Sequence, residues 1–130
     1  MTDHPNVDLF RRGHEAYAKQ DMATLTELIA EDTVWHIAGH GPLSGDLVGR
    51  DAVFGWFAKV GELSQGSVNL EPHDYVGNDD HVVALSRVTA TRGDKRLDVR
   101  QVEVGHWRDG RLVESFVVTD DQQAVDEFWA

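Results

Sequence analysis

Two histidines lie four residues apart in the segment VWHIAGHGPLSG, residues 34–45, and both could move protons or bind a metal ion. An unperturbed imidazole titrates near pH 6.5, so His36 and His40 suit acid and base chemistry at neutral pH. The stretch TVWHIA is β-branched and aromatic, which predicts a short strand, and the glycines and proline that follow predict a loop. We therefore expect His36 at the end of a strand and His40 in the loop.

Structural roles compete with these chemical ones. Buried polar groups need partners, so His36 fits a hydrogen-bonded structural histidine as well as a catalytic base. His40, in a glycine-rich loop, fits a solvated surface position better than a pocket. A metal site of His36, His40 and Glu103 is disfavoured, because a spacing of four brings two imidazoles to one side only on a helix, which Pro42 and its neighbouring glycines oppose. We expect neither a metal nor a cofactor.

The amino-acid composition disfavours several classes of binding partner. The chain has 130 residues, 41% of them hydrophobic, which predicts a single domain over residues 1–130 with its own core. A formal charge of −11 disfavours nucleic acid and anionic membranes as partners. There is no cysteine, which excludes disulfides and thiolate chemistry. The sequence shows neither an apolar run of membrane-spanning length nor a signal-peptide pattern, so we expect a cytoplasmic protein without membrane contact.

The elements that must position these side chains divide into helices followed by strands. Apolar spacing predicts helices over 7–20 and 21–32, the second capped by Asp21, and a third from about 49 to 63. Strand-like segments then occupy 67–77, 81–92, 95–107 and 111–119, with short turns that fix the register of an antiparallel meander. Residues 120–130 predict a terminal helix. This order is typical of an α+β fold.

Several of these segments together resemble the SnoaL-like and ketosteroid-isomerase-like proteins of the nuclear transport factor 2-like superfamily. The resemblance rests on AYAKQDMATLTELIAEDTVWHIAG, PLSGDLVGRDAVFGWFAKV, HVVAL and RDGRLVESFVVTDDQQAVDEFW, in that order along nearly the whole chain. It implies a cone-shaped fold, in which a strongly curved, mostly antiparallel sheet wraps around three N-terminal helices and encloses an apolar pocket. It also implies a homodimer built through the sheet.

The resemblance assigns roles to particular residues. His36 stands where the isomerases carry their general-base aspartate, and Glu103 matches their second oxyanion donor, an acid held neutral in an apolar site. Aligning the chains on Asp21 brings Gly13 to the position of their first donor, a tyrosine. Arg87 is expected to face the pocket, where it would bind a substrate carboxylate or enolate, or else pair with Glu103.

The same resemblance, with the alternation of side chains along the strands, gives the expected wall of the pocket. Aromatic and aliphatic side chains dominate it, as burial in a small domain favours. The expected binding residues are Trp35, His40, Phe54, Phe57, Leu85, Gln101, Trp107 and Val117.

Three functions remain open for this arrangement. The first is a cofactor-independent acid/base enzyme of the isomerase, cyclase or hydrolase type, with a hydrophobic, polyketide- or steroid-like substrate. In it His36 would move the proton while Glu103 and Arg87 steady negative charge. The second is a binding module that uses the same pocket without turnover. The third is an association module that acts through its dimer.

Overall fold

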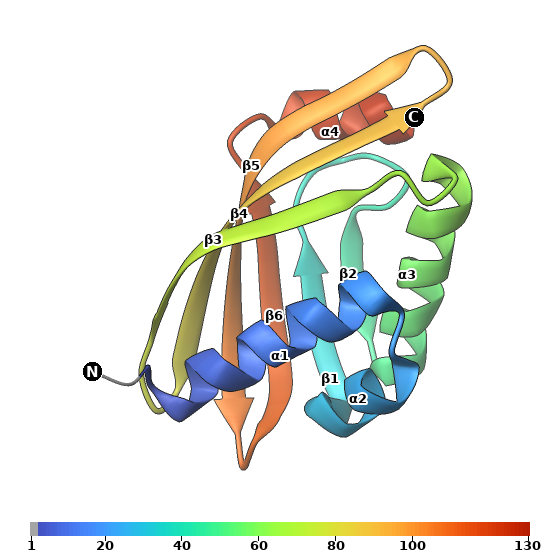
Figure 1. The fold of residues 1–130 in the computed structure, drawn as a ribbon. Coiled ribbons are helices and arrows are strands. Elements are labelled where there is room, and N and C mark those ends of the chain that lie inside the picture. Colours follow the sequence, from blue (N-terminus) through green and yellow to red (C-terminus); the bar gives the residue numbers. More distant parts are fainter. Residues whose placement is uncertain (1–2) are drawn as a thin grey trace.

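Four helices and six strands form one α+β unit in the computed structural model, which describes residues 3–130 (Figure 1). The helices are α1 (Pro5–Lys19), α2 (Met22–Leu28), α3 (Arg50–Ser64) and α4 (Gln122–Trp129). The strands are β1 (Ile29–Ile37), β2 (Gly45–Val48), β3 (Asn69–Gly77), β4 (His81–Arg92), β5 (Lys95–Arg108) and β6 (Arg111–Thr119). The predicted fold class is confirmed. Within residues 3–130, no helix combines the length and the apolar character needed to cross a membrane.

The sheet is mixed, with the strand order β2-β1-β6-β5-β4-β3. Strands β3 to β6 form the predicted antiparallel meander, and β1 joins it by pairing parallel to β6. The long strands bend so that α1 crosses the concave face, α3 stands beside it, and α4 lies at the end near the β4–β5 hairpin (Figure 1). This curvature makes room for a cavity between the sheet and the helices.

Capping residues set where the helices begin. The Asp21 side chain accepts a hydrogen bond from the backbone N–H of Thr24, so it caps α2 as predicted. α1 begins at Pro5, two residues before the predicted start at residue 7, and the Nδ1 atom of His4 caps it by accepting a hydrogen bond from the Asn6 N–H. α2 ends at Leu28, where the chain turns directly into β1.

β2 is an element that the sequence did not predict. It lies in the segment that we expected to be loop, and it pairs antiparallel with β1, Asp46 opposite His36. The strand is short and lies at the sheet edge, and its glycine and aspartate disfavour strand structure. Pairing with β1 therefore outweighs the local propensity.

Burial alternates along the central strands and separates two faces of the sheet. On β4 the concave face carries small and aliphatic residues, namely Val82, Ala84, Ser86, Val88 and Ala90. The convex face carries a band of six side chains aligned by the strand register, which we call the convex patch. It consists of Val83, Leu85, Val102, Val104, Phe116 and Val118. All four helices pack on the concave side or at its ends, which leaves the convex patch uncovered (Figure 1).

Candidate functional site

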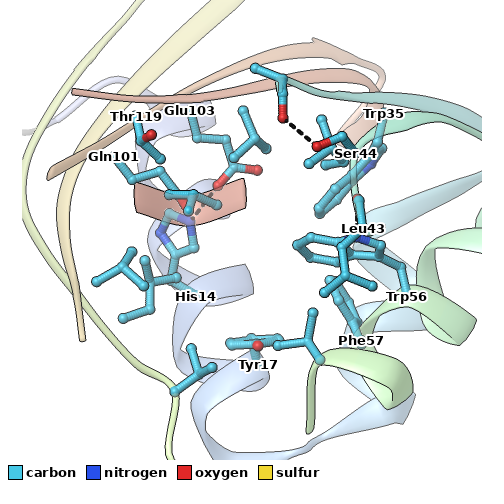
Figure 2. A pocket seen from close by; sticks show the side chains of 18 of the residues that line it. His14, Tyr17, Trp35, Leu43, Ser44, Trp56, Phe57, Gln101, Glu103 and Thr119 are labelled. Carbon is cyan, nitrogen blue, oxygen red and sulfur yellow. Dashed lines mark hydrogen bonds and ion pairs between the residues drawn. The ribbon is translucent and has the colours of Figure 1, made fainter. Parts of the chain in front are cut away.

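A cavity of about 140 Å³ lies between the concave face of the sheet and the helices. Its wall is mostly apolar and draws on all four helices, several strands and the loop after β1. Figure 2 shows Glu103 and His14 on one side of the cavity, Trp35, Leu43 and Phe57 on the other, and Tyr17 between them at the base. The cavity can therefore hold an apolar molecule beside a small polar group.

Glu103 is the residue that gives this cavity chemical character. Within residues 3–130 it is the only charged residue buried in the core, with 5% of its surface exposed. One carboxylate oxygen, Oε2, accepts a hydrogen bond of 2.8 Å from the hydroxyl of Ser115, and Oε1 lies 3.1 Å from Nε2 of His14. A buried carboxylate is costly unless it is hydrogen-bonded, and these two contacts provide that compensation.

His14 extends the polar contacts away from Glu103. Its Nδ1 atom lies 2.7 Å from the hydroxyl of Tyr75 on β3, and its ring stacks on Phe10 with 4.6 Å between ring centroids. Burial raises the pKa of Tyr75 to about 12, against the opposing charge of Arg11. Tyr75 therefore stays protonated at neutral pH, and its hydroxyl proton is available for a hydrogen bond.

Tyr17 lies one helical turn after His14 and faces the same cavity. Burial raises the pKa of its hydroxyl, and the negative charge of Glu103 raises it further. Its ring packs edge-on against Phe57 at 5.0 Å between centroids. The cavity thus holds a neutral phenol as well as the carboxylate.

The loop after β1 and helix α4 close one end of the cavity together. The backbone N–H of His40 donates to Asp126 at 2.9 Å, and this hydrogen bond is the main reason that the pKa of Asp126 is lowered. Gly41 lies against the α4 backbone so closely that an added Cβ would stand 3.1 Å from the Asp126 Cα. The glycines of this segment therefore permit a close approach of two backbones.

The structure places six of the predicted site residues in the cavity wall. They are Trp35, Phe57, Gln101, Glu103, Trp107 and Val117. Phe54 packs in the core beside the cavity without lining it, and His40 is exposed, with its backbone rather than its imidazole held by α4.

The expected position of His36 inside the cone is corrected by the structure. Side chains alternate along a strand, so with Trp35 in the cavity wall His36 must point to the convex face. There its two ring nitrogens each lie 2.8 Å from a carboxylate, Asp46 on β2 and Glu114 on β6, and its ring stacks on Phe116. These contacts raise the pKa of His36, that with Glu114 most.

The expected positions of Arg87 and Leu85 are corrected in the same way. Both side chains project from the convex face of β4, because the concave positions are those of Ala84, Ser86 and Val88. Arg87 forms a bidentate ion pair with Asp98, at 2.7 and 2.9 Å, and does not meet Glu103. The exposed guanidinium thus avoids the cost of burial that the cavity would impose.

Three residues near Glu103 were not predicted as site residues from the sequence, namely His14, Tyr17 and Tyr75. A signal was present for His14, which follows Val7 and Phe10 at helical spacing and so belongs to the buried face of α1. No such signal exists for the contact between His14 and Glu103, since 89 residues separate them in the chain.

The curved sheet, the helices on its concave face and the enclosed cavity form a cone with the fold of a nuclear transport factor 2-like protein. The chain belongs to the SnoaL-like family, since the SnoaL-like domain matches residues 10–115. The predicted family is therefore confirmed.

Individual relatives match over the whole chain. A protein of Mycobacterium tuberculosis, named as uncharacterized, is 31% identical over 100% of both chains. The structure of Bal32a, from a soil-derived mobile gene cassette, is 37% identical and covers 96% of each chain with a TM-score of 0.93. The fold is also that of IdmH from Streptomyces antibioticus, a proposed polyketide cyclase, with 21% identity, coverage of 94% of this chain and 96% of that one, and a TM-score of 0.76.

Proposed function

We propose that this protein binds a small hydrophobic ring compound in its cavity and catalyses a proton transfer on it, without a cofactor, with Glu103 as the base. The observation that carries the proposal is the burial of Glu103 in an apolar cavity, with His14 and Ser115 as its partners. Perturbed or buried titratable groups in clefts are a common mark of catalytic sites. The fold shared with IdmH supports a reaction of the cyclase or isomerase type.

The proposed step moves one proton from the ligand to Glu103 and leaves one electron pair on the ligand. A proton leaves a carbon next to a carbonyl group of the ligand and bonds to an oxygen of Glu103. The electron pair of the broken C–H bond stays on the ligand as an enolate. In a cyclisation the enolate carbon bonds to a second carbonyl carbon of the ligand, the π electrons of that C=O group move to its oxygen, and this oxygen takes the proton back from Glu103. In an isomerisation the enolate takes the proton back from Glu103 at a new position. A buried carboxylate suits the first step, because a general base works best in contact with the proton it removes.

The cavity volume limits the size of the substrate. Cavities of about 150 Å³ bind benzene, so 140 Å³ holds about one ring. A steroid- or polyketide-sized compound would bind with one ring enclosed and the remainder at the mouth. We therefore favour monocyclic ketones and lactones as the first compounds to test.

Proton exchange measures this activity directly. Cyclic ketones of increasing size are incubated with the protein in D₂O, and NMR follows the loss of the protons next to the carbonyl. We expect exchange with one size class and a decrease of about 100-fold or more in Glu103→Gln. Glu31→Gln, which removes the same charge from an exposed position on β1, is the control and should retain full exchange. Equal rates in Glu103→Gln and the unchanged protein would contradict the proposal.

A second function, association of two copies of the chain, is supported by the convex patch. Phe116 and Val118 expose 38% and 44% of their surface at the centre of a sheet face that no helix covers. Contiguous exposed apolar side chains of this kind are typical of interaction sites. We infer a homodimer that joins through the convex patch and leaves both cavities free. A charge introduced at Phe116 should separate the two copies.

A further inference from the structure

Four polar side chains from four elements form a continuous chain that begins at the cavity. Ser115 on β6 donates to Glu103 on β5, Glu103 contacts His14 on α1, and His14 contacts Tyr75 on β3. The side chains of His14 and Glu103 are only 10% and 7% exposed, so water does little to satisfy them. The positions of the protons along this chain are therefore set by the four groups themselves.

For a neutral His14 beside an ionised Glu103, the possible donors and acceptors leave one pattern of proton positions. A neutral imidazole has one N–H, and a carboxylate only accepts. If the proton were on Nδ1, the bare Nε2 of His14 would face a carboxylate oxygen of Glu103, and two acceptors would meet at 3.1 Å. With the proton on Nε2, His14 donates to Glu103 and Nδ1 accepts from the Tyr75 hydroxyl, so every contact has one donor.

Tyr75 is suited to the donor role because it stays protonated. Its pKa of about 12 follows mainly from burial, with the charges of Glu103 and Glu15 acting in the same direction and that of Arg11 opposing them. The Arg11 guanidinium lies 4.9 Å from the centroid of the Tyr75 ring, a cation–π contact that helps to hold the ring in place. The hydroxyl is thus held at the outer end of the chain.

We propose that Tyr75 and His14 are positioning residues, in which Tyr75 holds His14 in its Nε2–H tautomer and His14, with Ser115, holds Glu103 as a carboxylate that accepts the substrate proton. This inference rests on the proposed function of the cavity, and it assigns Glu103 to the opposite protonation state from the neutral acid that the resemblance implies. Protonation of Glu103 would reverse the chain, with the carboxyl donating to Nε2 and Nδ1–H donating to the Tyr75 oxygen.

NMR of the ligand-free protein tests the tautomer without a substrate. In the unchanged protein at pH 7 we expect the His14 ring spectrum of a neutral imidazole protonated at Nε2, and for Glu103 a carboxyl ¹³C shift of the ionised form. Tyr75→Phe removes one oxygen and keeps the ring, so the fold should persist, while the Nδ1 signal should move to that of a nitrogen without a hydrogen bond. Tyr17→Phe is the matched control, since the Tyr17 hydroxyl has no hydrogen bond to His14 within residues 3–130, and should leave both ring signals in place.

Proton exchange in the same variants connects the tautomer to catalysis. Tyr75→Phe should lower kcat about threefold to tenfold with KM unchanged, as loss of one aligning hydrogen bond predicts. A His14 protonated at Nδ1, or a Glu103 carboxyl shift of the neutral acid, would overturn the inference. The expected spectra in a protein that exchanges no ligand would refute the proposed function while the proton pattern stands.

Discussion

At the scale of single residues, the face of a strand decides what a side chain can do. Trp35 and His36 are neighbours, yet one lines the cavity and the other pairs with carboxylates on the convex face. The period of two along a strand forbids both from facing the cavity. The resemblance pointed to Glu103, and this rule placed Gln101 and Trp107 on the same strand face. The face expected for Arg87 also came from the resemblance and was wrong.

The contacts of His36 predict a pH dependence of stability. Glu114 and Asp46 raise its pKa, so the folded state binds a proton more tightly than the unfolded chain, in which histidine titrates near 6.5. The stabilisation is complete below about pH 6.5 and is lost as the pH rises through the raised folded value. Because the side chain is 30% exposed and its partners more so, we expect a loss of no more than about 1 kcal/mol.

Urea denaturation measures the contribution of His36 to the free energy of unfolding. The pH is varied from about 5.5 to about 8.5, the range in which histidines titrate. The unchanged protein should lose stability relative to His36→Gln as the pH rises. His73→Gln, a replacement at an exposed histidine on β3, should follow the unchanged protein. Parallel curves for the unchanged protein and His36→Gln would show that the two carboxylates do not stabilise the imidazolium.

At the scale of elements, the sequence predicted the features that depend on residues close together in the chain. The antiparallel strands, their tight turns and the Asp21 cap followed from periodicity and from turn and capping residues. β2 did not, because its pairing with β1 is a tertiary contact that overrides weak propensity. The contact between the loop after β1 and α4 could not be predicted either, because no residue near Gly41 in the sequence indicates that Asp126 lies beside it.

The contact between Gly41 and α4 predicts how two glycine substitutions change the free energy of unfolding. Gly41→Ala puts a methyl group 3.1 Å from the Asp126 Cα, where the neighbour is backbone and must move. We expect a loss of about 1 to 3 kcal/mol, the usual cost of overpacking. Gly55→Ala, on an exposed face of α3 with open space around it, should instead stabilise by about 0.5 to 1 kcal/mol, because alanine favours the helix. Urea midpoints of the two variants should shift in opposite directions, and a neutral Gly41→Ala would mean that the loop does not pack on α4 in solution.

At the scale of the whole molecule, the curved sheet separates two surfaces of different character. Its concave face encloses the cavity, where a buried carboxylate meets apolar walls, and its convex face presents the convex patch to the surroundings. The formal charge of −11 opposes association of two copies, so a dimer needs apolar burial to outweigh that repulsion. Beside the patch, Arg87 and Asp98 neutralise each other, whereas a protonated His36 between Asp46 and Glu114 still leaves one negative charge.

Phe116→Asp tests the convex patch as the dimer surface. The variant places a charge on the β6 side of the patch, near Glu114 and Asp46, where burial in an interface would be costly. We expect sedimentation to give the mass of two 14.5 kDa chains for the unchanged protein and of one chain for the variant. Met22→Asp, at an exposed apolar residue on the helical side, is the control and should remain dimeric. Because the cavity lies on the other face, proton exchange should persist in monomeric Phe116→Asp. Its loss on dissociation would show that the second copy completes the site, and a monomeric unchanged protein would refute the dimer.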